Sequence, residues 1–192
     1  MHAFDFIVLL LSFIYAAAVA HVLATTGDIV IAAKRIKFSW LNAGWMFVSL
    51  LTTCAWWISL WDLRDIKVWT TGLIGFFFSL AATFYVLTRM VCPRIPHDGP
   101  VDIIAFHREE GRKYVTVFAA IAVVTAITNS VLASAVGAGQ WPAQNLAVIP
   151  MAIAAVFAAI FIQATWLQFV ALSVELIAWA VYFTLLQSPL VG

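Results

Sequence analysis

The sequence predicts an all-α membrane protein built as a bundle of six transmembrane helices. Hydrophobic residues make up 65% of the 192 residues and charged residues only 10%, whereas a soluble domain is about half apolar and about a quarter charged. The apolar residues gather in six stretches, each able to supply the ~20 residues that a helix needs to cross a bilayer. Turn signals or charged residues separate these stretches.

The first three stretches are bounded by charge or by helix breakers. Residues 4–33 are longer than a span needs, so we expect this helix to tilt or to extend past the membrane. No Lys or Arg precedes its apolar run, unlike in a secretory signal peptide, and we interpret it as a retained span. The second span covers residues 41–61. The third covers residues 68–92 and ends at CPRIPHDGP, whose prolines and glycine stop a helix.

The last three spans follow a longer loop. The loop, residues 93–113, contains VDIIAFHREEGRKY, which fits either a short amphipathic helix on the membrane surface or a solvated loop. The fourth span covers residues 114–138 and ends at GAGQWP. The apolar region after it is too long for one span, and we divide it at QATWLQ into residues 145–162 and 166–187. We expect all 192 residues to form a single integral membrane domain.

The basic residues predict the orientation. Eight of the ten lie in or beside the first and third loops, and only Arg64 and Lys67 lie in the second. Short cytoplasmic loops are enriched in Lys and Arg, so we expect an inner-membrane protein with its N-terminus and C-terminus outside, in the periplasm. Tryptophans near predicted span ends agree with interfacial belts: Trp40, Trp61, Trp69, Trp141 and Trp166.

The two halves of the sequence show weak similarity. HVLATTG near the end of the first span resembles SVLASAVG near the end of the fourth, and FYVLTRMVCP resembles YFTLLQSP at the ends of the third and sixth. These matches would fit two three-span repeats, of which the second would insert upside down, as in inverted-repeat transporters. The alternative is a bundle that merely packs six spans.

Glu175 is the one carboxylate in the middle of the sixth span. Gln168, Trp179 and Tyr182 lie on the same side of that helix, so the stripe should face the bundle interior. A charge at the bilayer centre costs roughly 2.5–3.5 kcal/mol and marks a functional candidate. Glu175 is either a proton-relay or cation-site residue, or a neutral group that hydrogen-bonds a neighbouring helix. On depth alone, Asn129 of the fourth span is its expected partner.

Small and polar residues follow one side of the first span: Ala17, Ala18, His21, Thr25 and Asp28. Such residues allow close helix approach, so we interpret this side as a packing face. His21 is the one histidine well inside a predicted span. An alanine four residues before it resembles the way in which light-harvesting polypeptides ligate bacteriochlorophyll. His21 is therefore also a candidate axial ligand for a haem or a pigment.

Several classes of protein are disfavoured. A net charge of +1 without a basic cluster argues against a nucleic-acid partner. The chain has no P-loop, HExxH or GxSxG motif, so we expect no catalytic residues. Cys54 and Cys92 show no metal or redox spacing, and we expect no metal. Apart from the His21 alternative, we expect no cofactor.

Two functions fit these residues about equally. The first is a proton-linked transporter or channel for a small solute or ion, with Glu175, Asn129 and His21 facing an internal pathway. The second is a non-catalytic structural or accessory subunit, in which the polar stripes are helix interfaces. Beyond the lipid bilayer, the expected partner is a second copy of this chain or another membrane protein.

Overall fold

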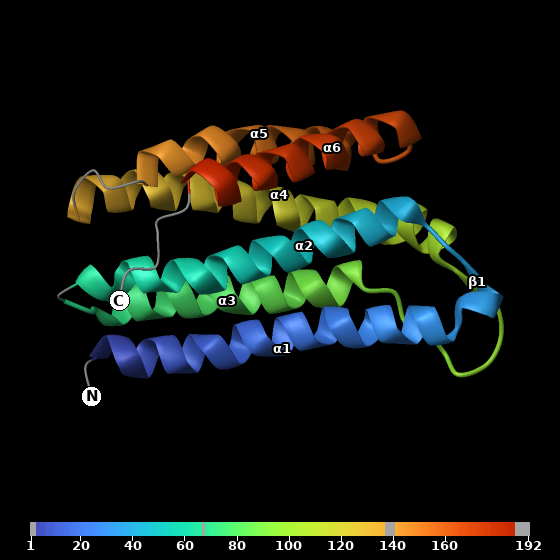
Figure 1. The fold of residues 1–192 in the computed structure, drawn as a ribbon, viewed down its shortest axis with the longest axis horizontal. Coiled ribbons are helices and arrows are strands. Elements are labelled where there is room, and N and C mark those ends of the chain that lie inside the picture. The colour runs from blue at the N-terminus through green and yellow to red at the C-terminus, as the bar shows by residue number, and fades with distance from the viewer. Residues whose placement is uncertain (1–2, 67, 137–140, 187–192) are drawn as a thin grey trace. The chain divides into compact units, whose positions relative to one another are not determined.

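The chain forms six long helices within the residues that the structure, a computed structural model, describes: 3–66, 68–136 and 141–186. The helices (Figure 1) are α1 (Ala3–Ile31), α2 (Trp40–Ser59), α3 (Thr71–Val91), α4 (Ile103–Val136), α5 (Trp141–Ile160) and α6 (Thr165–Val181). Each is long and apolar enough to cross a membrane. The predicted all-α bundle is confirmed, and the chain is a multi-pass membrane protein.

Short elements join the helices. They are the 3-10 segments η1 (Ala33–Arg35) and η2 (Leu60–Asp65), the π-helical segment η3 (Tyr182–Leu186), and the strands β1 (Ile36–Lys37) and β2 (Val101–Asp102). The main difference from our expectation is the start of α4 at Ile103. The amphipathic part of the predicted loop is thus neither a separate surface helix nor a solvated loop, because it continues directly into the span.

The chain divides into two compact units, Met1–Tyr114 and Val115–Gly192. A single membrane domain and an inverted repeat both stay predictions.

In the first unit, α1, α2 and α3 pack against one another (Figure 1). The buried positions of α1 recur every three or four residues, as expected for one helix face: Ile7, Leu11, Tyr15, Ala18, Val22 and Thr25. The ring of Tyr15 lies 5.7 Å from that of Phe84 on α3, and Trp57 Nε1 donates a hydrogen bond to Ser12 Oγ at 2.9 Å. Ala17 and Asp28 are exposed, so their predicted place on the packing face is wrong.

The α1–α2 connection and the α3–α4 connection contact each other at one end of the first unit. β1 and β2 pair in parallel, with Ile36 opposite Val101. Arg35 donates to the carbonyl oxygens of Pro96 at 2.6 Å and of Gly99 at 2.9 Å. Asp102 caps α4 by accepting from the Ala105 backbone N–H at 2.9 Å. The first and third loops therefore lie at the same end of this unit.

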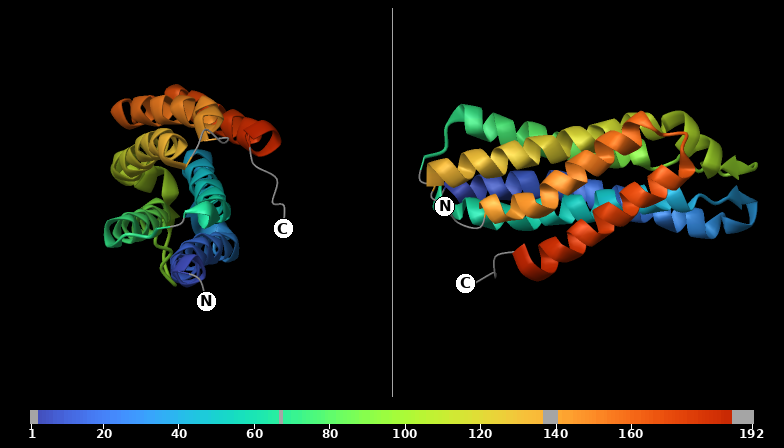
Figure 2. Two further views of the ribbon diagram at one scale, coloured as in Figure 1. Left: turned by 90° about the vertical axis from the view of Figure 1, so that its left-hand side faces the viewer. Right: turned by 90° about the horizontal axis from the view of Figure 1, so that it is seen from above.

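In the second unit, α5 and α6 form a helical hairpin (Figure 2). The hairpin turns at residues 161–164, close to the break predicted at QATWLQ. Alanines fill the buried faces of the two helices, and small side chains let helices approach closely in lipid: Ala147, Ala155, Ala158, Ala171 and Ala178. Asn145 of α5 donates to the Ala126 carbonyl oxygen of α4 at 3.2 Å.

Candidate functional site

Glu175 lies in α6 and is fully buried, with none of its surface exposed. Neither carboxyl oxygen has a hydrogen-bond partner among the described residues. Buried side-chain polar atoms in proteins are hydrogen-bonded in the large majority of cases. Leaving such a group unsatisfied costs about 1–3 kcal/mol. Glu175 is therefore a fully buried carboxyl group without a hydrogen-bond partner in the described part of the second unit.

The rest of the predicted stripe is buried as well. Gln168 is fully buried, and Trp179 and Tyr182 are each 6% exposed. The Trp179 indole N–H also has no partner in the described part of the chain. Trp179 follows Glu175 by one helical turn, so an unpaired donor and an unpaired acceptor lie on the same side of α6. The predicted burial of the stripe is confirmed, and a role in a pathway stays a prediction.

Gln168 has a structural role at the α5–α6 turn. Its Nε2 donates to the carbonyl oxygen of Ala158 at 2.7 Å and to that of Phe161 at 3.4 Å. The Ala158 carbonyl belongs to the last turn of α5, where helix carbonyls lack partners within the helix, and Phe161 directly follows that helix. Gln168 thus satisfies the end of α5 and holds the start of α6 beside it.

Asn129 is not the partner of Glu175. Its Nδ2 donates to Asn145 Oδ1 at 3.0 Å, and Asn145 in turn donates to Ser130 Oγ at 3.2 Å. The two asparagines join α4 to α5. Depth in the membrane suggested the wrong pairing, because the rotation of a helix decides which side chains of equal depth face each other.

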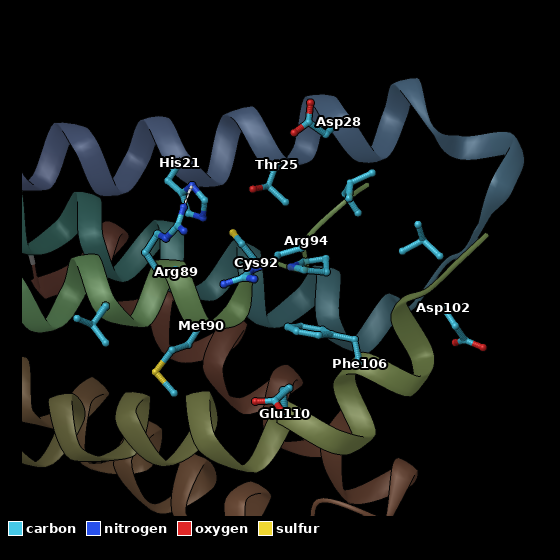
Figure 3. A pocket seen from close by; sticks show the side chains of 14 residues that line it. His21, Thr25, Asp28, Arg89, Met90, Cys92, Arg94, Asp102, Phe106 and Glu110 are labelled. Atoms are coloured by element: carbon cyan, nitrogen blue, oxygen red, sulfur yellow. Dashed lines mark hydrogen bonds between the residues drawn. The ribbon is translucent and has the colours of Figure 1, made fainter. Parts of the chain in front are cut away.

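His21 and Asp28 of α1 line a cavity in the first unit with a volume of about 890 Å³ (Figure 3). The last turns of α1 and α3, the start of α4 and the segment after α3 surround it. Its polar side chains come from all four segments: His21, Thr25, Asp28, Arg89, Arg94, Asp102 and Glu110. The structure thus brings two predicted residues together with several that sequence reasoning did not select.

Some charged side chains around this cavity form ion pairs, and others do not. Lys37 binds Asp102 at 3.1 Å and Lys113 binds Glu110 at 2.7 Å. Arg89 Nη1 lies 3.3 Å from His21 Nδ1. Among the described residues, neither Arg89 nor Arg94 has a carboxylate partner. The sequence could have indicated both arginines as site residues, since both lie at the predicted cytoplasmic end of the third span.

The contact with Arg89 argues against His21 as an axial ligand. A guanidinium can only donate, so His21 Nδ1 accepts and the neutral ring carries its proton on Nε2. With this tautomer Nε2 has no free lone pair, so ligation through Nε2 would require the ring to shift its proton and to give up the contact with Arg89. Within the described residues, no three or more of His, Cys, Asp and Glu gather closely enough to hold a metal ion.

The first unit also contains a cluster of buried polar side chains that the sequence analysis did not predict. Asn42 Nδ2 donates to the Val91 carbonyl oxygen at 2.9 Å and lies 3.5 Å from the Tyr114 hydroxyl. That hydroxyl also hydrogen-bonds His107 Nδ1. His107 is only 3% exposed, although its sequence position suggested a loop. These contacts fasten α2, the end of α3 and the start of α4 together.

No family model, no curated protein and no solved structure matches this chain.

Proposed function

We propose that this protein is a proton-linked transporter or channel for a small solute or ion, in which the Glu175 carboxyl gains and loses a proton or binds a cation. The observation that supports this most is that Glu175 is fully buried and both its oxygens lack a partner in the described part of the chain. Ionisable residues inside membrane spans commonly mark ion pathways and proton relays.

A purely structural carboxyl is less well supported. Such a group contributes to stability through a permanent hydrogen bond, and Glu175 has none among the described residues. A carboxyl group that binds and releases a proton, a water molecule or a cation must instead lack a permanent hydrogen bond. The unpaired Trp179 indole N–H, one turn away, adds a donor that a passing water molecule or solute can use.

The accessory-subunit interpretation is the runner-up. It explains the polar stripes as helix interfaces and nothing more, within the chain or with another subunit. The stripe on α6 is already buried within this chain, which leaves it unavailable to a partner without rearrangement. A homo-oligomer or a complex through other, apolar faces is compatible with both interpretations.

We also propose that the protein lies in the cytoplasmic membrane with both termini outside. The pairing of β1 with β2 supports this orientation, because it brings the first and third loops together at one end of the first unit. These loops and their neighbours hold eight of the ten basic residues, and the cytoplasmic side is the side enriched in Lys and Arg.

The test is proton movement in proteoliposomes loaded with a pH-sensitive dye. A potassium diffusion potential drives conduction, and an imposed Na⁺ or K⁺ gradient drives exchange. We expect wild-type protein to move protons faster than protein-free liposomes under at least one of these drives. Glu175→Gln should return the rate to that of protein-free liposomes, because an amide cannot titrate.

Ser173→Ala is the matched control. Ser173 is exposed on the same helix, and its hydroxyl donates to the Phe169 carbonyl oxygen at 2.9 Å, so the flux should remain. Wild-type rates equal to protein-free rates under every drive, or equal rates for Glu175→Gln and wild type, would contradict the proposal. Co-purification of another membrane protein in that case would favour the accessory subunit.

A further inference from the structure

The lengths of α1 and α3 indicate the level at which the cavity of the first unit would lie in a bilayer. α1 has 29 residues, which corresponds to a length of about 43 Å and exceeds the ~30 Å of a hydrocarbon core. α3 has 21 residues, about 31 Å, and carries Arg89 in its last turn. In a bilayer whose hydrocarbon core matches the length of α3, Arg89 would fall at the boundary of the hydrocarbon, and the cavity beside it would open at the level of phosphates and glycerol groups.

Two arginines supply unneutralised positive charge there. Arg89 and Arg94 line the cavity without carboxylate partners among the described residues. A guanidinium matches a phosphate group bidentately and is weakly hydrated, so it is well suited to phosphate recognition at an interface. The arginines lie five positions apart on either side of the α3 end, and both line the cavity.

The remaining free charge is negative. Asp28 of α1 lines the same cavity and has no basic partner among the described residues, whereas Asp102 and Glu110 each bind a lysine. A ligand that carries only negative charge would leave Asp28 unpaired. A ligand with both a phosphate and an ammonium group would satisfy all three free charges.

Apolar side chains complete the lining. Val86 and Met90 of α3 and Phe106 of α4 face the cavity together with the charged residues. Figure 3 shows Phe106 and Met90 beside the arginines and Glu110. Such a mixed surface fits an amphipathic molecule, whose head meets the charges while its glycerol and first methylene groups meet the apolar side chains.

We propose that this cavity binds the head group of an amine-bearing membrane phospholipid, with its phosphodiester on Arg89 and Arg94 and its ammonium group toward Asp28. The site is separate from Glu175 and does not depend on the transport proposal. The same chemistry occurs in free phosphoesters, but the head-group level and the apolar lining favour the lipid.

The experiment measures ligand binding to delipidated protein in detergent. The probes are short-chain phosphatidylethanolamine, short-chain phosphatidylglycerol and inorganic phosphate, each titrated while thermal unfolding and native mass spectra are recorded. We expect saturable binding of the phosphatidylethanolamine, with weaker binding of the phosphatidylglycerol and of inorganic phosphate. Replacing Arg89 or Arg94 by Gln should weaken lipid binding at least ~10-fold, because each removes a charge-assisted contact.

Two further variants make the result specific. Arg108→Gln removes an exposed charge from α4 outside the cavity lining and should leave lipid binding unchanged. Asp28→Asn should abolish the preference for the amine-bearing lipid over phosphatidylglycerol. Wild type and variants are compared only as monodisperse proteins with the same unfolding temperature in the absence of lipid.

Several results would overturn the assignment. Equal binding of inorganic phosphate and lipid would identify a soluble phosphoester as the ligand. Equal binding of the two lipids would remove the role given to Asp28. Absence of saturable binding, or the same loss in Arg108→Gln as in the arginine variants of the cavity, would show that the cavity is not a head-group site.

Discussion

The Tyr114 hydroxyl is the central atom of the cluster of buried polar side chains in the first unit. It contacts Asn42 Nδ2 and His107 Nδ1, and Tyr114 itself is 1% exposed. Tyr114→Phe removes the oxygen but keeps the ring, so the His107 nitrogen loses its partner. We expect a loss of about 1–3 kcal/mol in the free energy of unfolding, measured by chemical unfolding in mixed micelles.

The matched control is Tyr85→Phe on α3, where the side chain is 39% exposed. It should change the free energy of unfolding by less than about 0.5 kcal/mol. Equal effects of the two variants would mean that the Tyr114 hydroxyl has no stabilising role.

We expect Asp102 to make a small, pH-dependent contribution to stability. The Ala105 backbone N–H and the Lys37 ammonium donate to its carboxylate and lower its pKa from the ordinary value. A lowered pKa stabilises the fold above the ordinary value, and this contribution is lost as the pH falls through the lowered one. Wild type should therefore unfold at a higher temperature than Asp102→Asn at neutral pH.

This difference should shrink at about pH 3, below the ordinary aspartate pKa. The measurement is thermal unfolding of both proteins at the two pH values. A difference that stays constant or grows on acidification would contradict this assignment. Because Asp102 is exposed, we expect the effect to be small.

The sequence predicts the burial of single residues better than their partners. Glu175 had to avoid lipid because of its charge, and it is buried. The choice of Asn129 as its partner failed, because pairing depends on helix rotation. His107 and Tyr114 lie on one helix, yet the contact of Tyr114 with Asn42 depends on a fold that brings together residues 72 positions apart.

At the scale of elements, α1 shows how a small shift in a helix face changes a prediction. Ala18 is fully buried, whereas its neighbour Ala17 is exposed. We now expect Ala18→Phe to destabilise the fold by about 1–3 kcal/mol through overpacking. Ala17→Phe should be tolerated because that side chain faces outward. Unfolding in mixed micelles compares the two variants, and equal tolerance would show that α1 does not pack through Ala18.

The start of α4 could have been read from the sequence more accurately. Asp102 is a favoured N-cap residue and directly precedes the apolar residues Ile103 and Ile104. Charged residues 108–113 instead suggested a break, although a helix that leaves the membrane can carry them on its exposed turns. The pairing of β1 with β2 had no signal, since two-residue strands show no periodicity.

At the scale of the whole molecule, hydrophobicity alone predicts six spans because every backbone group in lipid must be paired within a helix. The side on which the termini lie still needs an experiment. In a variant without Cys54 and Cys92, a cysteine at Asp98 should be protected from an impermeant thiol reagent in intact cells. A cysteine at Val68, which is 74% exposed, should react.

Both positions must first react after the cells are opened. Reaction at Asp98 together with protection at Val68 would reverse the orientation of the first unit. Ser188 lies outside the described residues. The same labelling experiment with a cysteine at that position tests separately whether the C-terminus lies outside the cell.

The most direct test of the proposed function observes the Glu175 carboxyl itself. Infrared difference spectra of the protein in lipid, recorded between acidic and alkaline buffer, report carboxyl groups that gain or lose protons. We predict a carboxylic-acid band that changes with pH or with added cation in wild type and is missing in Glu175→Gln, while Ser173→Ala keeps it. Identical difference spectra for wild type and Glu175→Gln would show that Glu175 does not exchange a proton, and would contradict the proposal.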